Sequence, residues 1–119
     1  MVKMTTRIVE RLKTGSVKNV VQFGIATMPA APYVVVKPEA SGNGRNFLVI
    51  AHFKAGQNIL LENYIFNEVS TLLKNFVTTD RHGNNVRIKD AEKYTDIVVE
   101  NDDSTISMER VFYVPSRLH

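Results

Sequence analysis

The chain has 119 residues, 44% of them hydrophobic and 23% charged, a balance typical of one globular domain spanning residues 1–119. It contains no cysteine, so it has neither a disulfide framework nor thiolate chemistry. No apolar run approaches the roughly 18 residues of a membrane span, and residues 1–7 lack a signal-peptide core, so we expect cytosolic synthesis and no membrane partner. The net charge of +3 arises from lysine and arginine scattered among acidic residues, not from the basic cluster that nucleic-acid binding usually needs.

A short amphipathic helix is predicted near the N-terminus, where Thr5 or Thr6 can cap it and Gly15 can end it. Its apolar face consists of Ile8, Val9 and Leu12. Residues 17–25 fit either a helix or a strand, because valine recurs at helical spacing while the β-branched content and Gly24 favour a strand.

Two strands are predicted next, over Tyr33–Lys37 and Phe47–Phe53. Pro38 is expected to end the first strand, and Glu39–Asn46 is expected to form a polar loop too long for a two-residue hairpin. The second strand is apolar on both sides, whereas a strand with one wet face alternates with polar residues. We therefore expect both faces of this strand to be covered, either by helices or by a neighbouring subunit.

A strongly apolar helix is predicted over Ile59–Phe76, with Asn58 as its N-cap. At 100° per residue its apolar stripe comprises Leu61, Ile65, Val69, Leu72 and Phe76. Phe66 and Leu73 lie beside this stripe, so the apolar arc is wider than one core face requires. Phe66, Leu73 and the strand residue His52 are accordingly candidate subunit-interface residues. The alternatives are a helix that buries more than half its circumference on its own sheet and a histidine satisfied within its strand.

The C-terminal half reads as strands joined by polar segments. The predicted order is a polar loop over Thr78–Asn85, a short strand over Val86–Ile88, strands over Asp96–Glu100 and Ile106–Val114, and a turn over Asn101–Thr105 between the last two. The whole order predicts an α+β fold, with a mainly antiparallel sheet of four or five strands packed with one long and one short helix.

No catalytic, cofactor-binding or metal-binding pattern is found, so we expect a protein that is not an enzyme and has no cofactor. The three histidines show no metal-ligand spacing, and no cysteine is present to join them. The adjacent Asp102 and Asp103 suit a solvated turn better than a cation site. Ser41–Gly44 lacks the lysine and following helix of a phosphate-binding loop.

The order of segments resembles that of a known family. A short N-terminal amphipathic helix leads to a proline-marked P-Y-V-V-V strand, a loop, an apolar strand, a helix of the L-x-x-x-I-x-x-x-V kind and a hairpin with an acidic turn. This pattern resembles the tail terminator and tail completion proteins of long-tailed bacteriophages, including the lambda type, from about Thr6 to Val114. Head-completion and head–tail joining proteins of the phage neck share the pattern and remain an alternative.

The resemblance implies a structural virion protein that forms a homohexameric ring on the finished tail tube. Such a ring ends tube polymerisation and presents the surface to which a DNA-filled head attaches. The implied partners are further copies of the chain, the tail tube protein, a neck or head-completion protein, and genomic DNA that passes through the lumen without sequence-specific binding. The implied location is the head-proximal end of the virion tail, with assembly in the host cytoplasm.

Two polar segments are candidate docking loops for such partners. They contain Ser41, Asn43 and Arg45 in the first segment and Arg81 and His82 in the second. Polar loops suit contacts that form only on docking, although each could equally be a plain connection. A small nucleic-acid-binding regulatory domain is the further alternative, and a salt-sensitive shift of short DNA would identify it.

Overall fold

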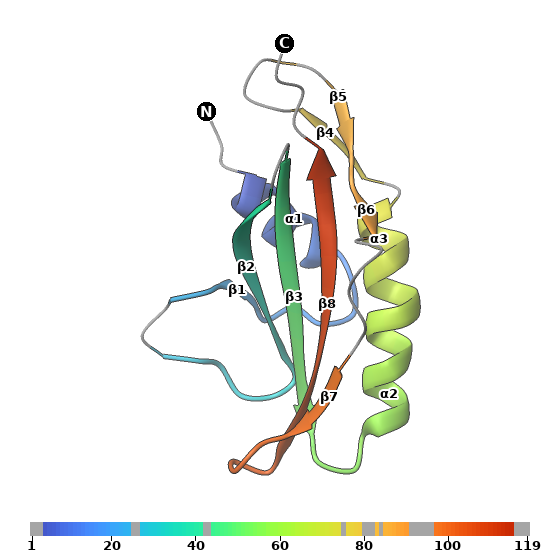
Figure 1. The fold of residues 1–119 in the computed structure, drawn as a ribbon. Coiled ribbons are helices and arrows are strands. Elements are labelled where there is room, and N and C mark those ends of the chain that lie inside the picture. Colours follow the sequence, from blue (N-terminus) through green and yellow to red (C-terminus); the bar gives the residue numbers. More distant parts are fainter. Residues whose placement is uncertain are drawn as a thin grey trace.

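The computed structural model describes residues 4–24, 27–41, 44–74, 76–79, 83, 85–90 and 97–115. Its main sheet contains six strands (Figure 1). β1, β2, β3 and β8 are neighbours in that order, and β6 and β7 each pair with β8. The strands are β1 (Val20–Gln22), β2 (Tyr33–Ser41), β3 (Gly44–Lys54), β6 (Lys89–Asp90), β7 (Ile97–Glu100) and β8 (Thr105–Pro115). Every pair is antiparallel except β1 with β2.

The helices are one short and one long. The short helix is α1 (Met4–Leu12), and the long helix runs through α2 (Asn58–Asn63), a π-helical segment η1 (Tyr64–Val69) and α3 (Ser70–Lys74). A second sheet pairs β4 (Val77–Thr79) with β5 (Asn85–Arg87). The predicted α+β class, mainly antiparallel sheet and pair of unequal helices are therefore confirmed.

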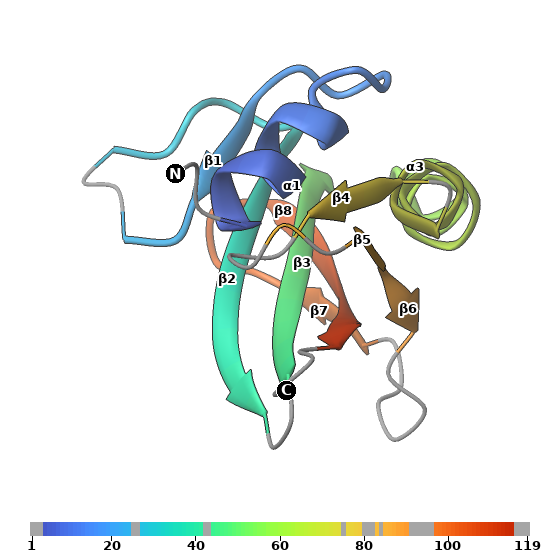
Figure 2. The same ribbon diagram turned by 90° about the horizontal axis from the view of Figure 1, so that it is seen from above.

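Both helices pack on the same face of the main sheet. Ile8 and Leu12 of α1 and Ile65 of the long helix share one buried cluster with Val49 of β3 and Phe112 of β8. Seen from above, α1 lies across β2 and β3 while the long helix runs beside the sheet (Figure 2). Successive side chains of a strand point to opposite faces of the sheet, and residues paired across neighbouring strands point to the same face. The apolar residues of β3 and β8 that contact the helices therefore collect on one face.

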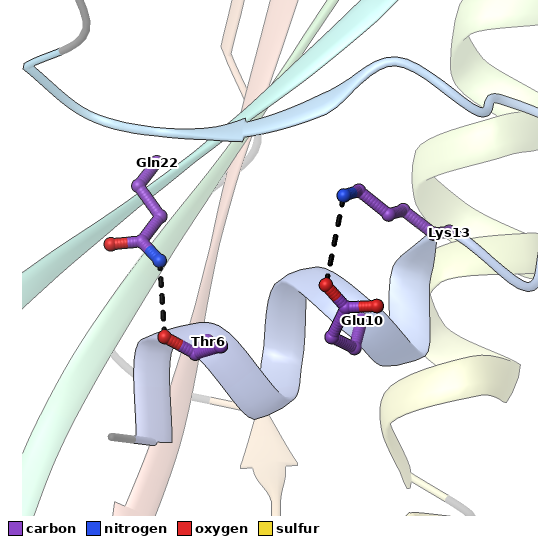
Figure 3. Close-up of polar contacts among 4 residues, drawn as sticks. All are labelled: Thr6, Glu10, Lys13 and Gln22. Carbon is purple, nitrogen blue, oxygen red and sulfur yellow. Dashed lines mark hydrogen bonds and ion pairs between the residues drawn. The ribbon is translucent and has the colours of Figure 1, made fainter. Parts of the chain in front are cut away.

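Polar contacts join α1 to neighbouring segments. Gln22 Nε2 of β1 donates to Thr6 Oγ1 at 3.1 Å, and Glu10 pairs with Lys13 at 3.6 Å along the helix (Figure 3). Arg7 donates from Nη1 to the hydroxyl of Thr79 at 2.7 Å, which ties α1 to the second sheet. The ambiguous segment 17–25 thus contains a short strand covered by α1, held by backbone pairing with β2.

The π-helical segment changes which residues of the long helix face inward. Leu61, Ile65, Val69 and Leu73 are fully buried, whereas Leu72 is only half-buried. These four lie four residues apart, a spacing that would drift by about 40° per step in a regular α-helix. Because each π turn holds more residues, the four-residue spacing stays in line with the core. The predicted stripe is therefore confirmed at Leu61, Ile65 and Val69, whereas Leu72 packs partly buried against the core and Leu73 takes the fully buried position.

The ends of the long helix also differ from the prediction. The helix begins at Asn58 itself, Gln57 occupies the N-cap position, and no side chain caps the first turn. Phe76 lies beyond the described helix, half-buried, with the Arg11 guanidinium 5.5 Å from its ring centre.

The β2–β3 hairpin is longer and tighter than predicted. β2 continues through Pro38, which pairs with Phe47, and the last pair is Ser41 with Gly44. The N–H of Val34 and the C=O of Val36 point toward β1. Because backbone direction repeats every two residues along a strand, the nitrogen of Pro38 points the same way, but beyond the end of β1. Proline therefore costs no hydrogen bond at this position. β3 is also paired with β8 as far as Gly44, which favours extended backbone over the predicted long loop.

The second predicted loop, Thr78–Asn85, is also partly strand. Thr78 pairs with Val86 and Thr79 pairs with Asn85 in the second sheet, and Thr78 is buried. The predicted strands Asp96–Glu100 and Ile106–Val114 correspond to β7 and β8, with Asp96 outside the described residues.

Candidate assembly surfaces

Phe66 lies in η1 with 45% of its surface exposed, although its neighbours Ile65 and Val69 are fully buried. The Arg110 guanidinium of β8 lies 5.4 Å from its ring centre, a distance at which a cation and an aromatic face attract. The ring is therefore held at the surface rather than packed inside. Phe66 stays a predicted interface residue.

Leu73 does not belong to such a surface. Its side chain is fully buried in the core cluster, because η1 rotates it toward the sheet. The assignment of Leu73 to a subunit interface is corrected accordingly, since a residue enclosed by its own domain cannot contact a neighbour.

The face of the main sheet opposite the helices is open. Figure 1 looks onto this face, with α1 behind the strands and the long helix alongside. Three residues from each of three adjacent strands form its centre. We call them the open face: Tyr33, Val35, Lys37, Leu48, Ile50, His52, Ser107, Glu109 and Val111.

The open face has a partly buried apolar centre, and no helix among the described residues covers it. Val35 and Val111 are buried yet lie outside the helix-covered core cluster, whereas Leu48 and Ile50 are half-buried. Within the described ranges, helices thus cover one side of β3 and leave the other accessible. Of the two expected ways to cover this strand, helices account for one face among the described residues, and cover of the other face by a neighbouring subunit stays a prediction.

His52 stands on the open face, stacked on Tyr33 with ring centres 4.4 Å apart. Burial lowers the pKa of His52 below 6.5, and the carboxylates of Asp103 and Glu109 oppose that shift. Burial chiefly, with a contribution from Asp103, raises the pKa of Tyr33. Nδ1 of His52 is buried and has no hydrogen-bond partner in the described part of the chain. His52 stays a predicted interface residue.

The predicted docking residues lie on different elements. Arg45 is exposed on β3, opposite Ala40 of β2, near the end of the hairpin. Ser41 is the last residue of β2 and pairs with Gly44. Asn43, Arg81 and His82 fall outside the described residues. The structure thus places Arg45 and Ser41 together at one end of the main sheet.

Further exposed apolar side chains were not predicted from the sequence. They are Ile59 and Leu60 in the first turn of α2, Phe23 and Met28 between β1 and β2, Val77 in β4 and Val99 in β7. The seven-residue spacing of Ile59 and Phe66 was a usable signal, because such residues share one helix face. Phe23 and Met28 gave none, since the exposure of an irregular segment depends on how the chain packs.

The described residues show little sign of reaction chemistry. They contain no group of three or more His, Cys, Asp and Glu side chains able to hold a metal ion. Asp103 accepts a hydrogen bond from Thr105 Oγ1 at 2.6 Å within the β7–β8 turn, which lowers the pKa of Asp103. In the same described ranges, none of the helices has the length and apolar character to span a membrane.

Comparison with known proteins adds no relative: no protein-family model matches the chain, and no curated protein is significantly similar to it.

Proposed function

We propose that this protein is a structural component of a tailed bacteriophage, a tail terminator that forms a homohexameric ring on the tail tube. The ring ends tube polymerisation and provides the surface for head attachment. The subunit acts by binding and blocking rather than by catalysing a reaction. The proposal rests on the resemblance in segment order together with the surfaces described above.

The open face is the observation that carries the proposal. Leu48, Ile50 and His52 are half-buried on the face that neither helix covers, so a subunit that worked alone would gain stability by covering them. A ring subunit has neighbours on both flanks and stacks on other virion proteins. It therefore needs more accessible apolar surface than a domain that works alone. The exposed side chains of Ile59 and Phe66 provide further surface of this kind.

The first experiment is light scattering after size exclusion over a wide concentration range, with negative-stain images of any large species. The proposal expects a particle of six 13.4 kDa subunits with a central hole. The same experiment is repeated with purified tail tubes, because a ring subunit can wait as a monomer until it meets its template. A monomer that neither assembles nor binds tubes would overturn the proposal.

Tube binding separates the terminator from its neighbours in the virion. A terminator binds the end of a tail tube and prevents further addition of tube protein. A head-completion or neck protein forms a ring but leaves naked tubes growing, so that outcome would move the assignment to the neck. A compact dimer that shifts short DNA in a salt-sensitive manner would support the regulatory alternative instead.

A further inference from the structure

Exposed apolar side chains gather on two opposite flanks of the subunit. One group lies on the connection between β1 and β2, where Phe23 and Met28 are exposed. The other lies on the long helix, where Ile59, at 75%, is the most exposed of the large apolar residues in the described ranges. Both Figure 1 and Figure 2 place this connection and this helix at opposite edges of the main sheet.

The first flank contains a hollow of about 380 Å³ at the outer edge of β1. Val20, Val21 and Met28 give it an apolar lining, and Lys13 and Lys18 stand beside them. Lys18 Nζ donates to the backbone carbonyl of Lys13 at 3.3 Å, which holds one ammonium group at the hollow. Lys13 pairs with Glu10 at 3.6 Å, a largely exposed contact that yields easily to another acid (Figure 3). We call Lys13, Lys18, Met28 and the hollow the edge patch.

The second flank projects outward and carries acid. Ile59 and Glu62 in α2 and Phe66 in η1 are all exposed on the long helix. Arg110 holds the Phe66 ring from behind at 5.4 Å, which reduces the side-chain entropy that docking would cost. We call Ile59, Leu60, Glu62 and Phe66 the helix patch.

The two patches complement each other in shape and in charge. One is a hollow lined by apolar and polar residues, two of them lysines, and the other consists of exposed apolar side chains and a glutamate on the long helix. Surfaces of opposite charge attract, whereas each patch facing its own copy would bring like charges together. The pairing is therefore between different patches of two molecules.

We propose that the helix patch of one copy of this chain docks on the edge patch of the next copy. Ile59 and Phe66 supply the apolar anchors, and Glu62 meets Lys13 and Lys18. Because the patches lie on opposite flanks, each subunit uses both at once, and such head-to-tail contacts close into a ring when the rotation per subunit allows it. This inference rests on the proposed ring and identifies the surfaces that would join it.

The absence of cysteine allows a direct test by cross-linking. Met28→Cys and Ile59→Cys are made separately, checked for native circular dichroism and melting, mixed in equal amounts and oxidised mildly. The proposal expects the mixed dimer to exceed the half share that random pairing would give. A chain carrying both cysteines should form a ladder of cross-linked oligomers.

Arg87→Cys, at an exposed position of β5 outside both patches, serves as the matched control for chance collisions. Cross-linking of Ile59→Cys to Met28→Cys at the level of this control would overturn the inference. Efficient cross-linking of Ile59→Cys to itself would also overturn it, since the contact would then be symmetric.

Charge exchange provides the second test. Lys18→Glu and Glu62→Lys should each raise the concentration needed for assembly by about two- to fivefold, and combining them in one chain should restore it. Arg87→Glu on β5 is exposed, lies outside both patches and should leave assembly unchanged. If the wild type forms rings while all four variants assemble equally well, the patch assignment fails and the ring proposal survives. A wild type that neither assembles nor binds tail tubes would instead overturn the ring proposal.

Discussion

Arg110 of β8 lies with its guanidinium 5.4 Å from the ring centre of Phe66 and donates from Nη1 to the Ser70 hydroxyl at 2.6 Å. The same nitrogen contacts the backbone carbonyls of Ile65 and Phe66 at 3.4 and 3.5 Å. One arginine on the helix-covered side of the sheet thus bonds to the long helix at η1 and at Ser70, the first residue of α3. It joins the sheet to the helix and fixes the exposed ring that the assembly proposals use.

Replacing Arg110 with Met should therefore destabilise the subunit, because methionine keeps an apolar stem but removes the hydrogen-bond donors. We expect the free energy of unfolding to fall by about 1–3 kcal/mol, as for the loss of charged hydrogen bonds, measured by urea titration. Arg87→Met, at an exposed position of β5, is the matched control and should change it by less than about 0.5 kcal/mol. An Arg110→Met variant as stable as the control would show that the contacts with η1 contribute nothing.

Alanine substitutions at Phe66 and Leu73 should distinguish an effect on self-association from an effect on folding stability. Leu73→Ala removes a fully buried side chain and should cost about 2–5 kcal/mol of folding stability. Phe66→Ala should cost only about 1 kcal/mol, because nearly half of the side chain is already in water, yet it should weaken self-association. Urea titration and light scattering measure the two effects. A larger stability loss for Phe66 than for Leu73 would contradict this division.

The long strands β2, β3 and β8 and both helices were predictable because their apolar residues recur with clear periods, whereas the short strands β4 and β6 were not predicted. The apolar stretch of β3 and the acidic turn before β8 located the central hairpins, and the helix was found from its four-residue repeat. The π-helical segment was not, because a few widened turns leave no local signature and merely exchange Leu72 for Leu73. Pro38 misled for a similar reason, since whether it ends a strand depends on which neighbour its nitrogen faces.

The candidate surfaces were less predictable than the fold. Phe66 was recognisable because it lies off the helix stripe, but the exposure of Met28 and the hollow beside it depends on how a loop packs against β1. The two-sided apolar pattern of β3 predicted that both of its faces are covered, whereas the choice of the face that the helices cover depends on where they dock. Such questions are settled by tertiary packing and not by local sequence.

Gly15 provides a test of how closely α1 and the long helix approach. A methyl group there would come within 2.7 Å of Glu68 Oε2 and 2.8 Å of Leu72 Cδ1. The same carboxylate oxygen accepts bonds from the Ser16 N–H and hydroxyl, both at 2.8 Å, so it is not free to move aside. Gly15→Ala should lower the free energy of unfolding by about 1–3 kcal/mol, measured by urea titration.

A double-mutant cycle tests this cause. In a Glu68→Ala background the penalty of Gly15→Ala should shrink, because the crowded carboxylate is gone. Gly56→Ala is the control, since φ is +90° there and nothing lies within 4 Å of the added methyl. Its cost arises from the backbone alone and should be the same with and without Glu68. Equal penalties for Gly15→Ala in both backgrounds would exclude crowding by Glu68 and leave Leu72 Cδ1 as the close contact.

His52 should make stability depend on pH in one direction. Burial lowers the pKa of His52 in the folded protein below 6.5, so the folded state resists protonation while the unfolded chain accepts it. The unfolded state therefore binds more protons as the pH falls through this range. The stability associated with neutral His52 is fully present above pH 6.5 and is lost as the pH drops toward the folded-state pKa.

His52→Gln removes this titration and isolates its effect. The free energy of unfolding of wild type minus that of the variant should decrease as the pH falls from about 7.5 to about 5, in urea titrations at fixed ionic strength. The other two histidines are present in both proteins and cancel in the difference. Asp103 stays ionised throughout this window, because its pKa lies below 3.8. A difference that is constant or grows on acidification would show that the folded state holds protonated His52 at least as well as the unfolded chain does.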